Sequence, residues 1–439
     1  MPSILALAYG LAGSGGNSIA TGAAQAASLA ILAALAWRRP SRLDHVDLAL
    51  GVLAAIAAVS SVTAIAASRN ETIALALTLT SYLAARGLSL EDLPSIRHGT
   101  LIAAGTITVI GTPLTAHALS EQWSDPHGHP IVLGLPSAVT MLTMAIGFLV
   151  IAVATDGPGG RRLAAWCAAL FLPIAIAAAS MVRFALMATL GAALVASAIA
   201  SCRRQRLAAA ALALTVLVAA ACGLGARHQT SAAFMRQFTA AAGALAPIAI
   251  PSAVAAPVAA PGNARMACDV EIDNSIAIRK ALLSQTLSLI PQAGPFGLGL
   301  DSFLRQSCLG MMPHNTLLQA LVEFGWIGGG MLMILMVSVA LRLVPIARNN
   351  RAAAFLLCAL AYMSALSMTH GSLSRDVGLF LLLGAGAGVI AGCRRPISSS
   401  LRKIPHHGFA QPIDVKDQRD FARGRDPAAT VDAGKRLSP

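Results

Sequence analysis

The stretch PSAVTMLTMAIGFLVIAVA, residues 136–154, decides the class of fold because it carries no charged residue over the length of a membrane helix. About 20 such residues cross the hydrocarbon core of a bilayer as an α-helix. The whole chain shares this bias: of 439 residues, 56% are hydrophobic and 12% are charged. Soluble domains carry roughly 25% charged residues, so the composition predicts an all-α integral membrane protein.

Similar apolar stretches recur along the chain and predict about twelve transmembrane helices. They cover residues 2–13, 20–36, 47–67, 71–85, 99–115, 136–154, 163–182, 184–201, 207–224, 326–345, 352–369 and 377–392. The first stretch, within MPSILALAYGLAG, lacks a basic n-region, so we expect a short first helix and not a cleaved signal peptide.

The basic residues explain the net charge of +13 without a nucleic-acid partner, because they punctuate the apolar stretches and form no single patch. Every second connection is basic. By the positive-inside rule these connections, the C-terminal tail and both termini are cytoplasmic. The residues concerned are Arg38, Arg39, Arg42, Arg86, Arg97, Arg161, Arg162, Arg203, Arg204, Arg206, Arg342, Arg348, Arg351, Arg394 and Arg395.

This orientation divides the chain into four parts. Residues 1–224 form an N-terminal transmembrane bundle, 225–325 a large outer loop, 326–392 the C-terminal transmembrane helices and 393–439 a polar, disordered cytoplasmic tail. Within the loop, Pro, Ala and Gly predict an irregular segment over residues 246–263. Helices are expected over 276–290 and from an N-cap at Asn315 to Phe324.

His314 is the first candidate catalytic residue. It lies at the start of the last predicted helix of the outer loop, where the positive end of the helix dipole disfavours imidazolium and keeps the ring available as a base. The alternative is an ordinary surface or capping histidine.

Two arginines are candidates for binding an anion. Arg279 offers a planar fork of donors that suits phosphate oxygens. Arg183 lies where two spans meet almost without a loop, at a depth where a charge is costly unless paired or hydrated. The alternatives are contact of Arg279 with solvent or headgroups and snorkelling of Arg183 to lipid headgroups.

Other residues of the outer side are weaker candidates. Gly297 and Gly299 predict a tight turn, and they form no dinucleotide or phosphate-loop motif. Cys268 and Cys308 are the cysteines of the outer loop and are candidates for a disulfide in an oxidising compartment. The outer residues His370, Arg375 and Asp376 are candidates to line the same cleft. His127 and His129 lack further ligands, so no metal site is predicted.

Residues 276–332 resemble the signature segment of the O-antigen ligase family of bacterial glycan transferases. The resemblance rests on the order of its members, which follow one another in this sequence as Arg279, Leu289-Ile290-Pro291, Gly297-Leu298-Gly299-Leu300-Asp301-Ser302-Phe303, Pro313-His314-Asn315, Leu317-Leu318-Gln319 and Glu323-Phe324-Gly325-Trp326-Ile327-Gly328. Arg183 fits the second essential arginine of the family by its position at the outer end of a middle helix.

The resemblance implies a glycosyltransferase C-like membrane enzyme of the bacterial inner membrane, with its active site on the periplasmic side. It implies transfer of a glycan from undecaprenyl pyrophosphate to a sugar of the lipid A-core in lipopolysaccharide biosynthesis. His314 would be the general base, and Arg183 and Arg279 would bind the pyrophosphate. No cofactor is expected, and the reaction would be metal-independent and inverting.

Three alternatives to an O-antigen ligase remain at this point. An O-antigen or exopolysaccharide polymerase would use the same donor, and a protein O-glycosyltransferase would share the signature. We favour the ligase because Arg279 is not followed by the spacing typical of polymerases. A lipid or solute transporter is a different class, but such proteins tend to show internal repeats and polar residues near the midplane, which this sequence does not show.

Overall fold

The computed structural model describes residues 44–63, 69–123, 136–180, 183–227 and 275–393, together with Ser231 and Met235. The elements of this described part are helices, without a β-strand. The two apolar stretches at residues 2–13 and 20–36, the segment 246–263 and the tail after residue 393 lie outside the described residues.

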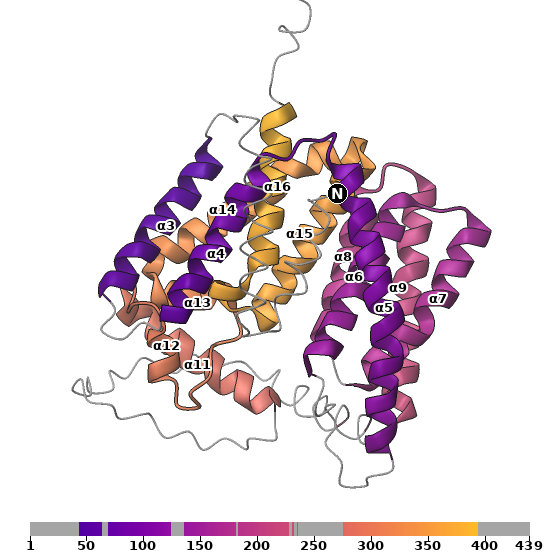
Figure 1. The fold of residues 1–439 in the computed structure, drawn as a ribbon, viewed down its shortest axis with the longest axis horizontal. Coiled ribbons are helices and arrows are strands. Elements are labelled where there is room, and N and C mark those ends of the chain that lie inside the picture. The colour runs from indigo at the N-terminus through magenta and orange to yellow at the C-terminus, as the bar shows by residue number, and fades with distance from the viewer. Residues whose placement is uncertain are drawn as a thin grey trace, which may run out of the picture. The chain divides into compact units, whose positions relative to one another are not determined.

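The helices follow one another along the described chain with mostly short connections (Figure 1). They are α3 (His45–Thr63), α4 (Arg69–Arg86), α5 (Leu93–Trp123), α6 (Pro136–Asp156), α7 (Gly160–Ala179), α8 (Arg183–Ile199), α9 (Arg203–Ala226), α11 (Ser275–Ala293), α12 (Ser302–Gln306), α13 (Thr316–Glu323), α14 (Gly325–Asn349), α15 (Arg351–His370), the 3₁₀ turn η2 (Leu373–Arg375) and α16 (Val377–Cys393).

A helix lies at each of the ten predicted apolar stretches between residues 47 and 392. Six helices are long and apolar enough to cross a membrane: α5, α6, α7, α9, α14 and α15. Shorter apolar helices lie within α3, α8 and α16. The chain is therefore an all-α membrane protein, and the figure of twelve spans stays a prediction.

The N-terminal and C-terminal helices interleave in one compact unit. Helix α14 packs against α3, α16 packs against α4, and α15 packs against both α6 and α8. The predicted parts 1–224 and 326–392 thus share a core, because helices that are distant in sequence supply each other's buried faces. The core is rich in Ala and Leu, and small residues allow membrane helices to approach closely.

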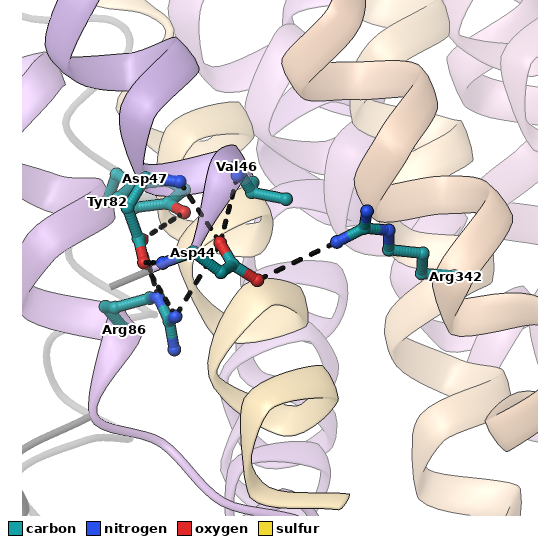
Figure 2. Close-up of polar contacts among 6 residues, drawn as sticks. All are labelled: Asp44, Val46, Asp47, Tyr82, Arg86 and Arg342. Atoms are coloured by element: carbon teal, nitrogen blue, oxygen red, sulfur yellow. Dashed lines mark hydrogen bonds and ion pairs between the residues drawn. The ribbon is translucent and has the colours of Figure 1, made fainter. Parts of the chain in front are cut away.

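One end of this bundle carries a group of charged and polar side chains, which we call the clamp: Asp44, Asp47, Tyr82, Arg86 and Arg342 (Figure 2). Asp47 accepts hydrogen bonds from Arg86 Nε at 2.7 Å and Nη2 at 2.8 Å, and a third from the Tyr82 hydroxyl at 2.9 Å. Arg342 on α14 lies 3.8 Å from Asp44. The clamp therefore ties α3, α4 and α14 together.

Basic residues gather at this clamp end, as the alternation of the loops predicts. Arg97 at the start of α5 pairs with Asp156 at the end of α6, with 3.1 Å between Nη2 and Oδ1. Arg351 lies 3.9 Å from the same carboxylate and follows directly on the Asn350 that joins α14 to α15. The opposite end of the bundle, which we call the site end, carries the starts of α8 and α16 and the end of α15.

Candidate functional site

Three helices bring their ends or sides together at the site end. Helix α8 begins at Arg183 and Phe184, α15 ends at His370, and α11 contributes Arg279. The guanidinium of Arg279 stacks over the ring of Phe184, with 4.0 Å between Cζ and the ring centroid. Phe184 and His370 meet edge to face, with their centroids 5.6 Å apart. Arg279 is thus fixed in orientation by an aromatic surface.

Arg279 also fixes the protonation of His370. Its Nη2 lies 3.5 Å from His370 Nδ1. A guanidinium can only donate, so Nδ1 of the imidazole accepts and the ring in this arrangement is neutral, with its proton on Nε2. Among the described residues, Arg279 forms no ion pair with a carboxylate. Its contacts orient the guanidinium without neutralising it.

Arg183 and Arg279 lie within electrostatic range of each other. Burial, and then the positive charge of Arg183, lower the pKa of Arg279. An arginine nevertheless stays protonated in proteins, so two half-buried positive charges share one region. Positive charge concentrated in a region of reduced dielectric attracts anions strongly. This pair is therefore a candidate site for an anion.

His314 belongs to the same electrostatic neighbourhood. Burial, and then the positive charge of Arg279, lower its pKa below the ordinary value of 6.5. The imidazole is therefore neutral at pH 7 and able to accept a proton. The direction agrees with the expectation from the sequence, although here burial and Arg279 cause the shift. Its φ of 52° is left-handed, a conformation that is uncommon for a residue with a side chain.

The residues after His314 hold this unusual turn in place. Asn315 caps α13, because its side chain accepts from Leu318 N at 3.0 Å, which confirms the predicted N-cap. Its Nδ2 donates to Met368 O at 2.9 Å, which joins α13 to α15. The buried Thr316 donates to Asp376. The turn is thus anchored to α15 and to the segment before α16.

Asp376 lies behind this turn, where it accepts a hydrogen bond from Thr316. Burial raises the pKa of Asp376 to about 6 against the opposing effect of this hydrogen bond. Its neighbour Arg375 pairs with Glu71, with 2.6 Å between Nη2 and Oε1. Asp376 therefore supports the His314 turn, and Arg375 serves a contact between η2 and α4.

The predicted glycine turn is a crossing of two backbone segments. Gly297 has a φ of 85°, and a Cβ on it would lie 2.2 Å from Glu323 O. Gly325 has a φ of 71°, and its Cβ would lie 2.4 Å from Gly297 N. Gly299, with a φ of 99°, donates to Glu323 O at 3.1 Å. The glycines position the end of α13, so they act on the site through that helix.

Cys308 is disulfide-bonded, and Cys268, its expected partner, lies outside the described residues. The described chain contains no group of three or more His, Cys, Asp or Glu side chains that could hold a metal ion. His127 and His129 also lie outside it.

The structure thus places Arg183, Arg279 and His314 in one cluster, with His370 and Phe184 in contact with Arg279. His370 was expected on this side of the protein, whereas sequence reasoning missed Phe184, which looks like an ordinary apolar residue of a span. The signal was its position directly after an arginine at a helix start.

Comparisons with known proteins add no identification. The sequence matches no family model, no curated protein and no solved structure. The function therefore has to be argued from the cluster itself.

Proposed function

We propose that this protein is an O-antigen ligase, which transfers a glycan from undecaprenyl pyrophosphate to a sugar of the lipid A-core. The observation that supports the proposal is the electrostatic neighbourhood of Arg183, Arg279 and His314. Two arginines and a neutral imidazole are the groups that such a transfer requires, and the sequence around them follows the order of the O-antigen ligase signature.

In the proposed reaction the arginines stabilise the diphosphate of the donor. As the bond between the anomeric carbon and the pyrophosphate breaks, negative charge grows on the departing diphosphate. Donors fixed in advance where charge develops stabilise the transition state. Arg279 is suited to this because Phe184 and His370 hold its plane, and Arg183 adds a second charge.

The acceptor end of the reaction falls to His314. A neutral imidazole removes the proton of the acceptor hydroxyl while that oxygen attacks the anomeric carbon. A single displacement of this kind inverts the configuration at that carbon. Two arginines supply the positive charge that other transferases take from a divalent cation, so the proposed mechanism is metal-independent and needs no cofactor.

The proposal includes the setting of the enzyme. We infer a glycosyltransferase C-like arrangement of about twelve spans in a bacterial inner membrane, with the site end facing the periplasm and the basic clamp end facing the cytoplasm. The ends of the described helices support this orientation, since Arg86, Arg97, Arg342 and Arg351 gather opposite to His314.

The decisive experiment compares His314→Ala with His117→Ala in a strain that lacks the native copy. The control removes a histidine that is 74% exposed and lies 3.8 Å from Glu121 on its own helix. We expect His314→Ala to insert at normal levels and to lose polysaccharide attachment, and His117→Ala to behave as the native protein. Normal attachment in the His314→Ala strain would refute the assignment of His314 as the general base.

The lipopolysaccharide of the deletion strain separates the ligase from a polymerase with the same donor. Loss of all long chains, with accumulation of lipid-linked polymer, is the outcome expected of a ligase. A core that carries one repeat would identify a polymerase. Unchanged lipopolysaccharide together with a transport defect would favour a transporter.

A further inference from the structure

A second candidate binding site lies at the clamp end, remote from His314. A cavity of about 480 Å³ opens between α5, α6 and α15. This volume is within the roughly 300–1,000 Å³ typical of small-molecule sites. Its lining residues are Pro94, Arg97, His98, Leu101, Asp156, Asn350, Arg351 and Ala352. These three helices pack against one another, so the charged side chains at their ends share this cavity.

The lining carries more positive than negative charge. Arg97 and Arg351 both approach Asp156, at 3.1 and 3.9 Å. One carboxylate cannot neutralise two guanidinium groups, so the cavity keeps a net positive charge even with a neutral His98. The start of α15 adds the positive end of a helix dipole.

Arg97 retains an unused donor. Its Nη2 contacts Asp156 and also donates to Ala152 O at 3.4 Å. Its Nε is buried, and no described residue accepts a hydrogen bond from it. A buried donor without a partner costs roughly 1–3 kcal/mol. An oxyanion in the cavity would accept this hydrogen bond.

The surroundings favour an anion that carries a lipid chain. The cavity lies at the ends of helices that are apolar enough to span a membrane, so in the proposed orientation it would lie near the lipid headgroups. Leu101 lines the cavity, and further along α5 the side chains of Ile102 and Val109 are 61% and 74% exposed. Apolar side chains exposed along a membrane helix contact acyl chains.

We propose that this cavity binds the phosphate of an anionic phospholipid, with Arg97 and Arg351 as its ligands and the acyl chains along α5. Basic pockets between transmembrane helices suit such headgroups. A zwitterionic lipid fits less well, because its ammonium group would face two arginines.

The test is lipid retention by the purified full-length protein, measured by native mass spectrometry. The protein is released from nanodiscs that contain phosphatidylglycerol and phosphatidylcholine in equal amounts. We expect retained phosphatidylglycerol to exceed phosphatidylcholine. Arg351→Gln should lower that excess about fivefold, the effect of one basic residue near an anionic lipid. Arg351 is 63% exposed, so this variant should fold.

Two further variants make the test specific. Arg348→Gln removes the same charge from an exposed position of the clamp end that does not line the cavity, and it should leave the excess unchanged. Asp156→Asn removes the competing carboxylate and should increase the excess.

Three results would overturn the proposal. The first is equal retention of the two lipids, and the second is an equal loss in Arg348→Gln and Arg351→Gln. The third is displacement of phosphatidylglycerol by millimolar inorganic phosphate, which would show that the cavity recognises a free anion. Because lipid binding is measured without glycan transfer, failure here leaves the proposed ligase function untouched, and the converse also holds.

Discussion

Arg86 at the clamp end and Arg279 at the site end are the same residue type used in opposite ways. Arg86 donates two hydrogen bonds to Asp47 at 2.7 and 2.8 Å and is only 6% exposed. Arg279 lies over an aromatic ring, beside a histidine and near a second arginine. The first charge is satisfied within the fold, and the second is oriented within the fold while its charge is left for a ligand.

This difference separates a structural arginine from a functional one. A buried ion pair is strongly destabilising to break, because the remaining partner is left buried and charged. Stacking on Phe184 and the contact with His370 orient Arg279 near a second arginine without neutralising its charge, so its desolvation carries a cost that a bound anion would offset. The two ends should therefore respond differently to the same substitution.

The largest effect expected is on stability, at the clamp. Arg86→Gln leaves the Asp47 carboxylate buried without its bidentate partner, and we expect a loss of about 3–5 kcal/mol in the free energy of unfolding. Unfolding in mixed micelles measures it. Arg348→Gln is the control, because Arg348 is exposed at the same end. A stability equal to that of the control would mean that the clamp is not structural.

A slightly smaller effect is expected on catalysis, at the site. Arg279→Lys keeps the charge and loses the planar fork that stacks on Phe184. We expect the rate of glycan transfer to fall about 10²–10³-fold, as for the loss of one preorganised donor, with the free energy of unfolding nearly unchanged. The neighbouring exposed Lys280→Arg should have native activity. Native activity of Arg279→Lys would show that planar recognition of phosphate is wrong.

The third effect tests the backbone crossing that supports α13 at the site end. Gly297→Ala would force a Cβ against the Glu323 carbonyl, so we expect destabilisation beyond the roughly 1–2 kcal/mol of a left-handed residue alone. Gly294→Ala is the matched control, because Gly294 also has a positive φ but has open space around it. Equal losses in the two variants would argue against the backbone crossing as the support of α13.

The smallest effect is a shift in pH dependence. The lowered pKa of His314 means that the base stays neutral below pH 6.5 and is lost only as the pH falls through the lower value. We expect the acid limb of transfer below pH 6.5. Arg279→Gln removes one cause of the shift, so the His314 titration followed by NMR should move upward. Asp376→Asn is the control for the acid limb, because Asp376 is a nearby carboxyl whose pKa is about 6. The acid limb should remain in this variant if His314 causes it. A lower pKa of His314 in Arg279→Gln would contradict the electrostatic effect of Arg279 on His314.

Much of the fold follows from hydropathy alone. The stretch at residues 136–154 predicts α6, and the run before Asn350 predicts α14, because apolar length is a local property. The partner of each helix is not local. Nothing in the periodicity of α16 indicates that it packs on α4. The interleaving of N-terminal and C-terminal helices therefore could not be predicted from the sequence.

The candidate site could also be predicted only in part from the sequence. Arg183, Arg279 and His314 could be grouped from the sequence, because charge alternation puts them at one end and the signature order links two of them. The contacts of Arg279 with Phe184 and His370 could not be predicted, since they depend on how α8, α11 and α15 meet in space. Asp376 was expected near the cleft, but its bond to Thr316 depends on the turn after α15.

The backbone crossing at Gly297 and Gly325 has a consequence for finding relatives of this chain. Two segments of main chain pass each other there with no side chain between them. A distant homologue that keeps the crossing must therefore keep both glycines, even where the flanking residues differ. A search pattern that pairs these two positions with the histidine between them would detect kinship that overall sequence similarity misses.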